Sequence, residues 1–141
     1  MQPSGDDVIV GTKDADVILA GDGRDRVRGG SGDDLICGQG GPDKLKGSAG
    51  DDIIAGGPGE DSVSGGVGRD ILLGGDDDDD LSGGGDADNL DGGRGDDRVR
   101  GGGDGDTLRG GEGLDRFDGG AGEDACIDPD QPGPFARCEL P

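Results

Sequence analysis

The sequence repeats itself every nine residues, and this repeat constrains the fold more than any other feature. Blocks of nine counted from Gln2 stay in register to Ile127, giving fourteen blocks such as GGSGDDLIC (29–37) and GGRGDDRVR (92–100). We number the positions within a block as places one to nine. Because a fixed period of this kind is typical of solenoids, the chain is predicted to stack its blocks so that each contacts only its neighbours.

Two places in the block never change character. Place six is aspartate in all fourteen blocks, and place eight is always apolar, from Ile9 to Cys126. Glycine occupies place one in twelve blocks and places two and four in ten blocks each. Glycine at these places permits positive φ, and aspartate, its only substitute at place four, also tolerates the left-handed region. The aspartates at place four are Asp14, Asp77, Asp86 and Asp104.

Composition alone favours disorder, because the net charge is −21 and only 1% of the residues are aromatic. A disordered acidic chain, however, would not be expected to preserve a nine-residue repeat over fourteen blocks. Even the run of five aspartates at 76–80 puts Asp79 at place six and leaves Leu81 at place eight. The repeat therefore predicts ordered structure. The acidity argues against binding to nucleic acid or anionic membranes, and the apolar runs are too short to span a bilayer.

Each block predicts a turn of about six residues followed by a strand of about three. Alternation along the strand turns place eight inward and places seven and nine outward. Two successive blocks then make one coil, with turns on opposite sides and two parallel sheets facing each other. Stacking seven such coils brings the same place in blocks two apart to about 4.8 Å.

This stacking predicts two columns of carboxylates at place six. Neighbouring charges about 4.8 Å apart repel by roughly 1 kcal/mol in water and about 3.5 kcal/mol at an effective dielectric of about 20. The small core does not offset this repulsion together with the entropy of ordering the backbone, so a cation must enter between the turns. Carboxylate and carbonyl oxygens suit Ca²⁺ better than Mg²⁺ or Zn²⁺, and the gaps allow at most about twelve ions. The candidate ligands are Asp7, Asp16, Asp25, Asp34, Asp43, Asp52, Asp61, Asp70, Asp79, Asp88, Asp97, Asp106, Asp115 and Asp124.

The blocks resemble the RTX, or haemolysin-type, calcium-binding nonapeptide G-G-x-G-x-D-x-U-x, from Gln2 to Ile127. The resemblance implies an all-β fold, a parallel β-roll (a right-handed β-solenoid) of about seven two-strand coils. It also implies calcium held between turns by the place-six aspartates and by carbonyls of the glycine turns. Family members are typically exported bacterial proteins that fold with calcium outside the cell, so the expected location is secreted and extracellular. The end blocks lack a neighbour on one side, which makes Asp7, Asp16, Asp115 and Asp124 the weakest candidates.

The outward places seven and nine differ between odd and even blocks. Even blocks form an apolar face, made of Val17, Leu19, Leu35, Ile53, Ile71 and Leu73 with Cys37 and Ala55. Odd blocks form a basic face, with Arg26, Arg28, Lys44, Lys46, Arg98, Arg100 and Arg116. The apolar face is either a contact surface, for self-association or a neighbouring domain, or the ordinary exposed area of a soluble monomer. The basic face either binds an anionic partner such as an acidic polysaccharide or only balances nearby turn carboxylates.

Residues 128–141 break the repeat, so the chain is predicted to consist of a repeat domain (2–127) and an irregular C-terminal cap (128–141). A bridge between Cys126 and Cys138 would fold this cap over the open end of the core, as terminal repeats require, and would indicate an oxidising compartment. Two free thiols are the alternative. Cys37 is left over and either pairs between chains or stays unpaired.

These observations predict a non-catalytic calcium-binding module with a structural or interaction role. The sequence contains no histidine, and its serines lie in repeat turns or strands without a base beside them, so we expect no enzyme. Two alternatives remain. One is a surface adhesion or self-association module that uses the apolar face, and the other is a disordered calcium buffer, which would have no need of an apolar place eight.

Overall fold

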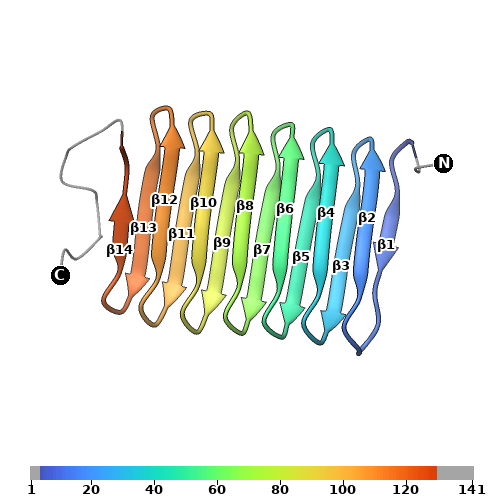
Figure 1. The fold of residues 1–141 in the computed structure, drawn as a ribbon, viewed down its shortest axis with the longest axis horizontal. Helices are drawn as coiled ribbons and strands as arrows, with labels where there is room; N and C mark the ends of the chain where they lie inside the picture. Colours follow the sequence, from blue (N-terminus) through green and yellow to red (C-terminus); the bar gives the residue numbers. More distant parts are fainter. Residues whose placement is uncertain (1–3, 130–141) are drawn as a thin grey trace.

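The computed structural model describes residues 4–129 as a stack of parallel strands joined by short turns (Figure 1). One sheet contains the odd-numbered strands β1 (Val8–Val10), β3 (Arg26–Ser31), β5 (Lys44–Ala49), β7 (Ser62–Val67), β9 (Asp80–Gly85), β11 (Arg98–Gly103) and β13 (Arg116–Ala121). The other contains the even-numbered strands β2 (Val17–Asp22), β4 (Leu35–Gly40), β6 (Ile53–Pro58), β8 (Ile71–Asp76), β10 (Asn89–Arg94), β12 (Thr107–Glu112) and β14 (Ala125–Ile127). The predicted all-β solenoid of about seven coils is confirmed.

The pairing register follows the repeat. Each strand pairs with the strand two blocks away, so that Val8 lies opposite Arg26 and Leu90 lies opposite Leu108, eighteen residues apart. Every described pairing is parallel, and the two sheets of seven run along the whole stack. The odd-numbered and even-numbered strands point in opposite directions in Figure 1, because each turn carries the chain from one sheet to the other.

The core lies between the two sheets and is one side chain deep on each side. Place eight is buried in every block from Ile18 to Cys126, and Ile9 packs against this core partly buried. Place one also points inward, where Ala20 and the glycines of the later blocks are buried. The apolar core is therefore essentially one row of place-eight side chains per sheet, because the glycines at place one have no side chain to add to it.

The predicted strand length was wrong. Most strands have six residues, from place seven to place three of the next block, and not three. Parallel pairing needs only backbone N–H and C=O groups, which glycine supplies as well as any residue. The glycines at places one and two therefore belong to strands, and only places four to six form the turn.

The backbone at place four behaves as predicted in three of the four aspartate blocks. Asp77, Asp86 and Asp104 have φ of 79°, 69° and 66°. The prediction was wrong for Asp14, which does not adopt positive φ. Its N–H donates instead to the hydroxyl of Thr12 at 3.1 Å, which closes a local turn.

The last strand, β14, ends at Ile127. The predicted cap (128–141) lies outside the described residues from 130 onward, and so does Cys138, the predicted partner of Cys126. Cys37 is a free, half-buried thiol on the outer face of β4. Within residues 4–129 the structure has no helix that could cross a bilayer.

Candidate metal centre

The place-six aspartates line the inside of the turns in two columns. Eleven of them are buried, whereas Asp7, Asp16 and Asp115 are only partly buried. Within each column, the Oδ1 atom of each aspartate accepts a hydrogen bond from the backbone N–H of the aspartate eighteen residues earlier, as Asp79 does from Asp61 at 2.8 Å. Twelve such bonds of 2.7–2.9 Å join the fourteen aspartates, one in every gap between neighbouring turns.

The second carboxylate oxygen of these aspartates is buried and has no hydrogen-bond partner. This holds for Oδ2 of Asp25, Asp34, Asp43, Asp52, Asp61, Asp70, Asp79, Asp88, Asp97 and Asp106. A buried carboxylate oxygen without a partner costs free energy, because it has lost its hydration without compensation. Each gap in the central part of the roll thus contains an oxygen that lacks a positively charged or hydrogen-bonding neighbour.

Glycine at place one makes room for this oxygen. A Cβ built on Gly74 would overlap both Asp79 Oδ2 and the carbonyl oxygen of Gly92, in the next turn of the same side. The same two groups flank the place-one glycines of the neighbouring blocks, such as Gly56 and Gly83. A carboxylate oxygen and a carbonyl oxygen therefore converge above the α-carbon of the place-one glycine. Glycine is required there because a larger residue would overlap these oxygens, and not because the backbone has positive φ.

Burial dominates the electrostatics of the columns. Desolvation raises the pKa of Asp79 to about 8 and that of Asp70 to about 7. It also raises the pKa to about 6 for Asp61, Asp88, Asp97 and Asp106. The hydrogen bond from the preceding aspartate's N–H lowers each of these pKa values, and repulsion between carboxylates raises them.

This order of causes refines the sequence argument. Repulsion along the column was the expected penalty, but in the structure repulsion comes after burial as a cause of the raised pKa values. A cation beside Oδ2 would counter both causes, because it would offset the lost hydration and screen the repulsion between neighbouring carboxylates.

The donor set suits a hard cation. Among residues 4–129 no three carboxylate or thiol side chains come close enough to hold a metal by themselves. A cation in a gap must therefore use backbone carbonyls as well as carboxylates. Calcium accepts such mixed oxygen ligands in flexible geometry, whereas zinc favours histidine and cysteine. The unpartnered Oδ2 atoms and the converging glycine carbonyls fit calcium.

The N-terminal end of the even column is different. Oδ2 of Asp16 accepts hydrogen bonds from the Thr12 N–H at 2.6 Å and from the Thr12 hydroxyl at 3.0 Å. Thr12 stands at place two, where most blocks have glycine. The protein's own groups thus occupy the position that stays open in the central turns.

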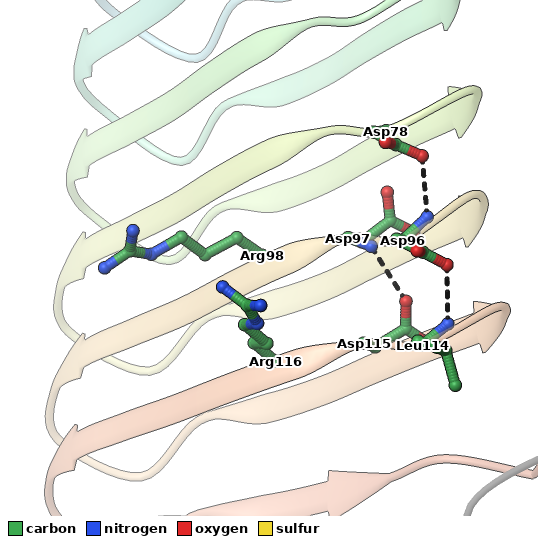
Figure 2. A pocket seen from close by; sticks show the side chains of 7 residues that line it. All are labelled: Asp78, Asp96, Asp97, Arg98, Leu114, Asp115 and Arg116. Atoms are coloured by element: carbon green, nitrogen blue, oxygen red, sulfur yellow. Dashed lines mark hydrogen bonds between the residues drawn. The ribbon is translucent and has the colours of Figure 1, made fainter.

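Sequence reasoning missed a second ladder, at place five. The exposed Asp33, Asp51, Asp78 and Asp96 each accept at Oδ1 from the N–H of place five two blocks later, and Asp6 does the same. Figure 2 shows both ladders, because Asp78 binds Asp96 and Asp96 binds Leu114 in one direction while Asp97 binds Asp115 in the other. The signal was present as aspartate pairs at place five in blocks two apart. These carboxylates brace the turns from outside and are not aimed into the roll.

The sequence model of the family described as RTX calcium-binding nonapeptide repeat (4 copies) matches residues 4–36, 38–72, 64–99, 73–108 and 100–126. These matches span almost all the strands and turns described above. No curated protein matches the chain.

Proposed function

Because the chain belongs to the family of proteins with RTX calcium-binding nonapeptide repeats, we propose that it is a non-catalytic, extracellular module whose β-roll folds when calcium binds between successive turns. The place-six aspartates are the proposed ligands, joined by carbonyl oxygens of the glycine strands. The role of the module is structural or a matter of interaction with a partner.

The observation that carries this proposal is the row of buried Oδ2 atoms without partners in the central turns. Without a metal, burial disfavours ionisation in the centre of the columns at neutral pH, since it raises the pKa of Asp79 to about 8. Metal binding would then supply folding free energy, since the unfolded chain has no preformed site.

The affinity range of extracellular calcium modules supports the proposed extracellular location. Extracellular calcium modules work at about 10⁻⁴–10⁻³ M. A chain tuned to that range stays unfolded at cytosolic calcium levels and folds after export.

The test is a calcium titration of the full chain, followed by far-ultraviolet circular dichroism from chelator to about 10 mM Ca²⁺, with Mg²⁺ as the control. We expect a cooperative gain of β signal with calcium only. Equilibrium dialysis at saturation should count no more than about twelve ions per chain. A chain that stays coil at saturation would instead be a disordered calcium buffer. A full β signal in chelator would mean that the roll stands without metal.

A second candidate function is self-association through the apolar face. Exposed fractions of 74% for Val17, 50% for Leu19 and 43% for both Ile53 and Leu73 support it. The test is sedimentation velocity with calcium, comparing the wild type with the double variant Leu35→Ser, Ile53→Ser. Serine already occupies the corresponding outward places on β7. A concentration-dependent larger species that the variant loses supports self-association, and a monomer at all concentrations contradicts it.

A further inference from the structure

The outer face of the odd-numbered sheet has four cationic side chains in a two-by-two array. Arg26 and Arg28 on β3 pair in register with Lys44 and Lys46 on β5, and all four side chains are exposed. Neighbouring strands lie about 4.8 Å apart, and alternate residues on one strand lie about 6.7 Å apart. We call these four residues the basic grid.

The strands next to the grid present no acidic side chain beside it on this face. Its neighbours on the same face are Val8 and Val10 on one side and Ser62 and Ser64 on the other. No ion pair of the basic grid occurs among residues 4–129, in a chain with 34 acidic residues.

Two arginines outside the grid do balance turn carboxylates, although Lys13, Arg24, Arg98, Arg109 and Arg116 also form no ion pair among residues 4–129. Arg69 pairs with Asp51 at 3.0 Å, and Arg94 pairs with Asp76 at 3.1 Å. Balancing the turn charge is thus a role that these arginines fill and the grid does not.

Beyond the grid the face continues as a row of hydroxyls and then as cations again. Ser62 and Ser64 are followed by Ser82, and Arg98 and Arg116 project from neighbouring strands, away from the aspartates of the turns (Figure 2). The one acidic side chain in this middle stretch, Asp80, is bound by Arg100 at 2.6 Å. From β3 to β11 the cationic, hydroxyl and cationic stretches extend over roughly 19 Å along the roll.

The chemistry of this face selects a narrow class of ligand. No outward place on the described odd-numbered strands is aromatic, so the face cannot stack on a neutral sugar ring. Its outward places hold seven basic and two acidic residues, a formal charge of +5 in a chain of −21. The acidic turns at both margins repel a wide, densely charged polymer such as duplex nucleic acid. A thin polymer that has both anionic groups and hydroxyls fits between them.

We propose that the basic grid, together with the serine row and Arg98, binds a linear acidic polysaccharide that lies along the axis of the roll. The cations pair with its carboxylate or sulfate groups, and the serines donate to and accept from its hydroxyls. The inference rests on the proposed function, because the face exists only in the folded roll. Calcium bound in the turns also reduces the surrounding negative charge, so binding depends on calcium.

The probe is a fluorescently labelled hyaluronan octasaccharide, measured by anisotropy at 1 mM-scale calcium with the fold checked by circular dichroism in the same samples. We expect saturable binding to the wild type that weakens steadily as NaCl is raised, because the contacts are charge pairs on an exposed surface. The variant Arg26→Ser, Arg28→Ser, Lys44→Ser, Lys46→Ser should bind at least about tenfold more weakly.

The matched control removes four cations from elsewhere, as Lys13→Ser, Arg24→Ser, Arg69→Ser, Arg109→Ser. It has the same net charge as the grid variant and should bind within about twofold of the wild type. Serine at the grid reproduces the outward places of β7, and the four residues of the control are exposed, so both variants should keep the calcium-dependent β signal.

The proposal would be overturned by no binding to a folded wild type at low salt, by equal losses in both variants, or by equal binding of a neutral dextran octasaccharide. If a single-stranded oligonucleotide bound more tightly than the acidic sugar, the ligand of this face would be another class of polymer, which would also contradict the proposal. A wild type without β signal in calcium would identify a failure of the proposed function rather than of the site.

Discussion

The turns around Asp79 and Asp16 carry the same aspartate at the same place of the repeat, yet their carboxylates are in opposite states. Asp79 is 3% exposed, its Oδ2 has no partner, and burial raises its pKa to about 8. Asp16 is partly exposed, and its Oδ2 accepts two hydrogen bonds from Thr12. The repeat motif alone does not determine the state of the carboxylate; the two turns differ in the residue at place two and in their depth in the stack.

Depth matters because each turn is covered by the turns before and after it. Asp79 lies between Asp61 and Asp97 and takes part in a hydrogen bond with each. Within its column Asp16 has a neighbour on the C-terminal side only, Asp34, to which its N–H donates. The central turns thus combine the strongest desolvation with the largest number of charged neighbours, and they are where calcium should contribute most to folding.

The largest effect is expected from filling the space at place one. Gly74→Ala puts a methyl group against Asp79 Oδ2 and the Gly92 carbonyl, which displaces both candidate ligands. We expect a loss of at least about 2 kcal/mol of folding free energy in saturating calcium, measured by urea unfolding. Gly85→Ala is the matched control, since a Cβ there meets nothing within 4 Å. Equal losses in the two variants would mean that stability depends on glycine content and not on the space that Gly74 leaves for Asp79 Oδ2 and the Gly92 carbonyl.

The second prediction separates the two turns directly. Asp79→Asn keeps an Oδ1 acceptor for the Asp61 N–H but removes the charge that would bind calcium. The calcium midpoint of folding should rise about tenfold, equivalent to roughly 1.4 kcal/mol. Asp16→Asn should shift this midpoint by less than about twofold, because Thr12 already satisfies its Oδ2. Similar shifts in the two variants would show that the Thr12 bonds do not decide which turn binds the ion.

Much of this architecture could be predicted from the sequence, because the period of nine determines it. Strict phase at places six and eight predicted two parallel sheets, the eighteen-residue register and the two columns of place-six aspartates. These features depend on periodicity, which is insensitive to the identity of any one residue. The exceptions required local detail. The hydroxyl of Thr12 changes the turn at Asp14, and nothing in the repeat pattern indicates that hydrogen bond.

The function of place-one glycine could not be read from the sequence either. Glycine signals a turn when only φ is considered, but Gly74 is a buried strand residue without positive φ. Its role is to leave room for oxygens from its own block and from the block two further along. Such a steric requirement between distant residues appears only when the coils are stacked in space.

The third prediction concerns pH in the absence of metal. The pKa of Asp79 is 3.8 in the unfolded reference and about 8 in the roll, so folding favours the protonated form. This stabilising contribution is complete below about pH 4 and is lost as the pH rises through about 8. The chelated chain should therefore gain β signal as the pH falls from 9 to 5.5, which stays above its pI of about 4.1. Asp79→Asn should flatten this dependence more than Asp16→Asn, and a signal that falls toward acid would contradict the burial argument.

The smallest effect is expected from making the N-terminal turn resemble the central ones. Thr12→Gly removes the hydroxyl that binds Asp16 Oδ2 and permits the positive φ found at place two in blocks such as that of Gly30. Without calcium the variant should lose about 1 kcal/mol, because a hydrogen bond to a carboxylate is lost. With calcium this loss should shrink or reverse, because Asp16 Oδ2 would then be without a hydrogen-bond partner, as Asp79 Oδ2 is, and could bind the ion. Thr12→Ser, which keeps the hydroxyl, should match the wild type in both conditions. Equal losses for Thr12→Gly with and without calcium would mean that an open Oδ2 is not enough, and that the cover of a turn on each side is what makes an aspartate of this roll a calcium ligand.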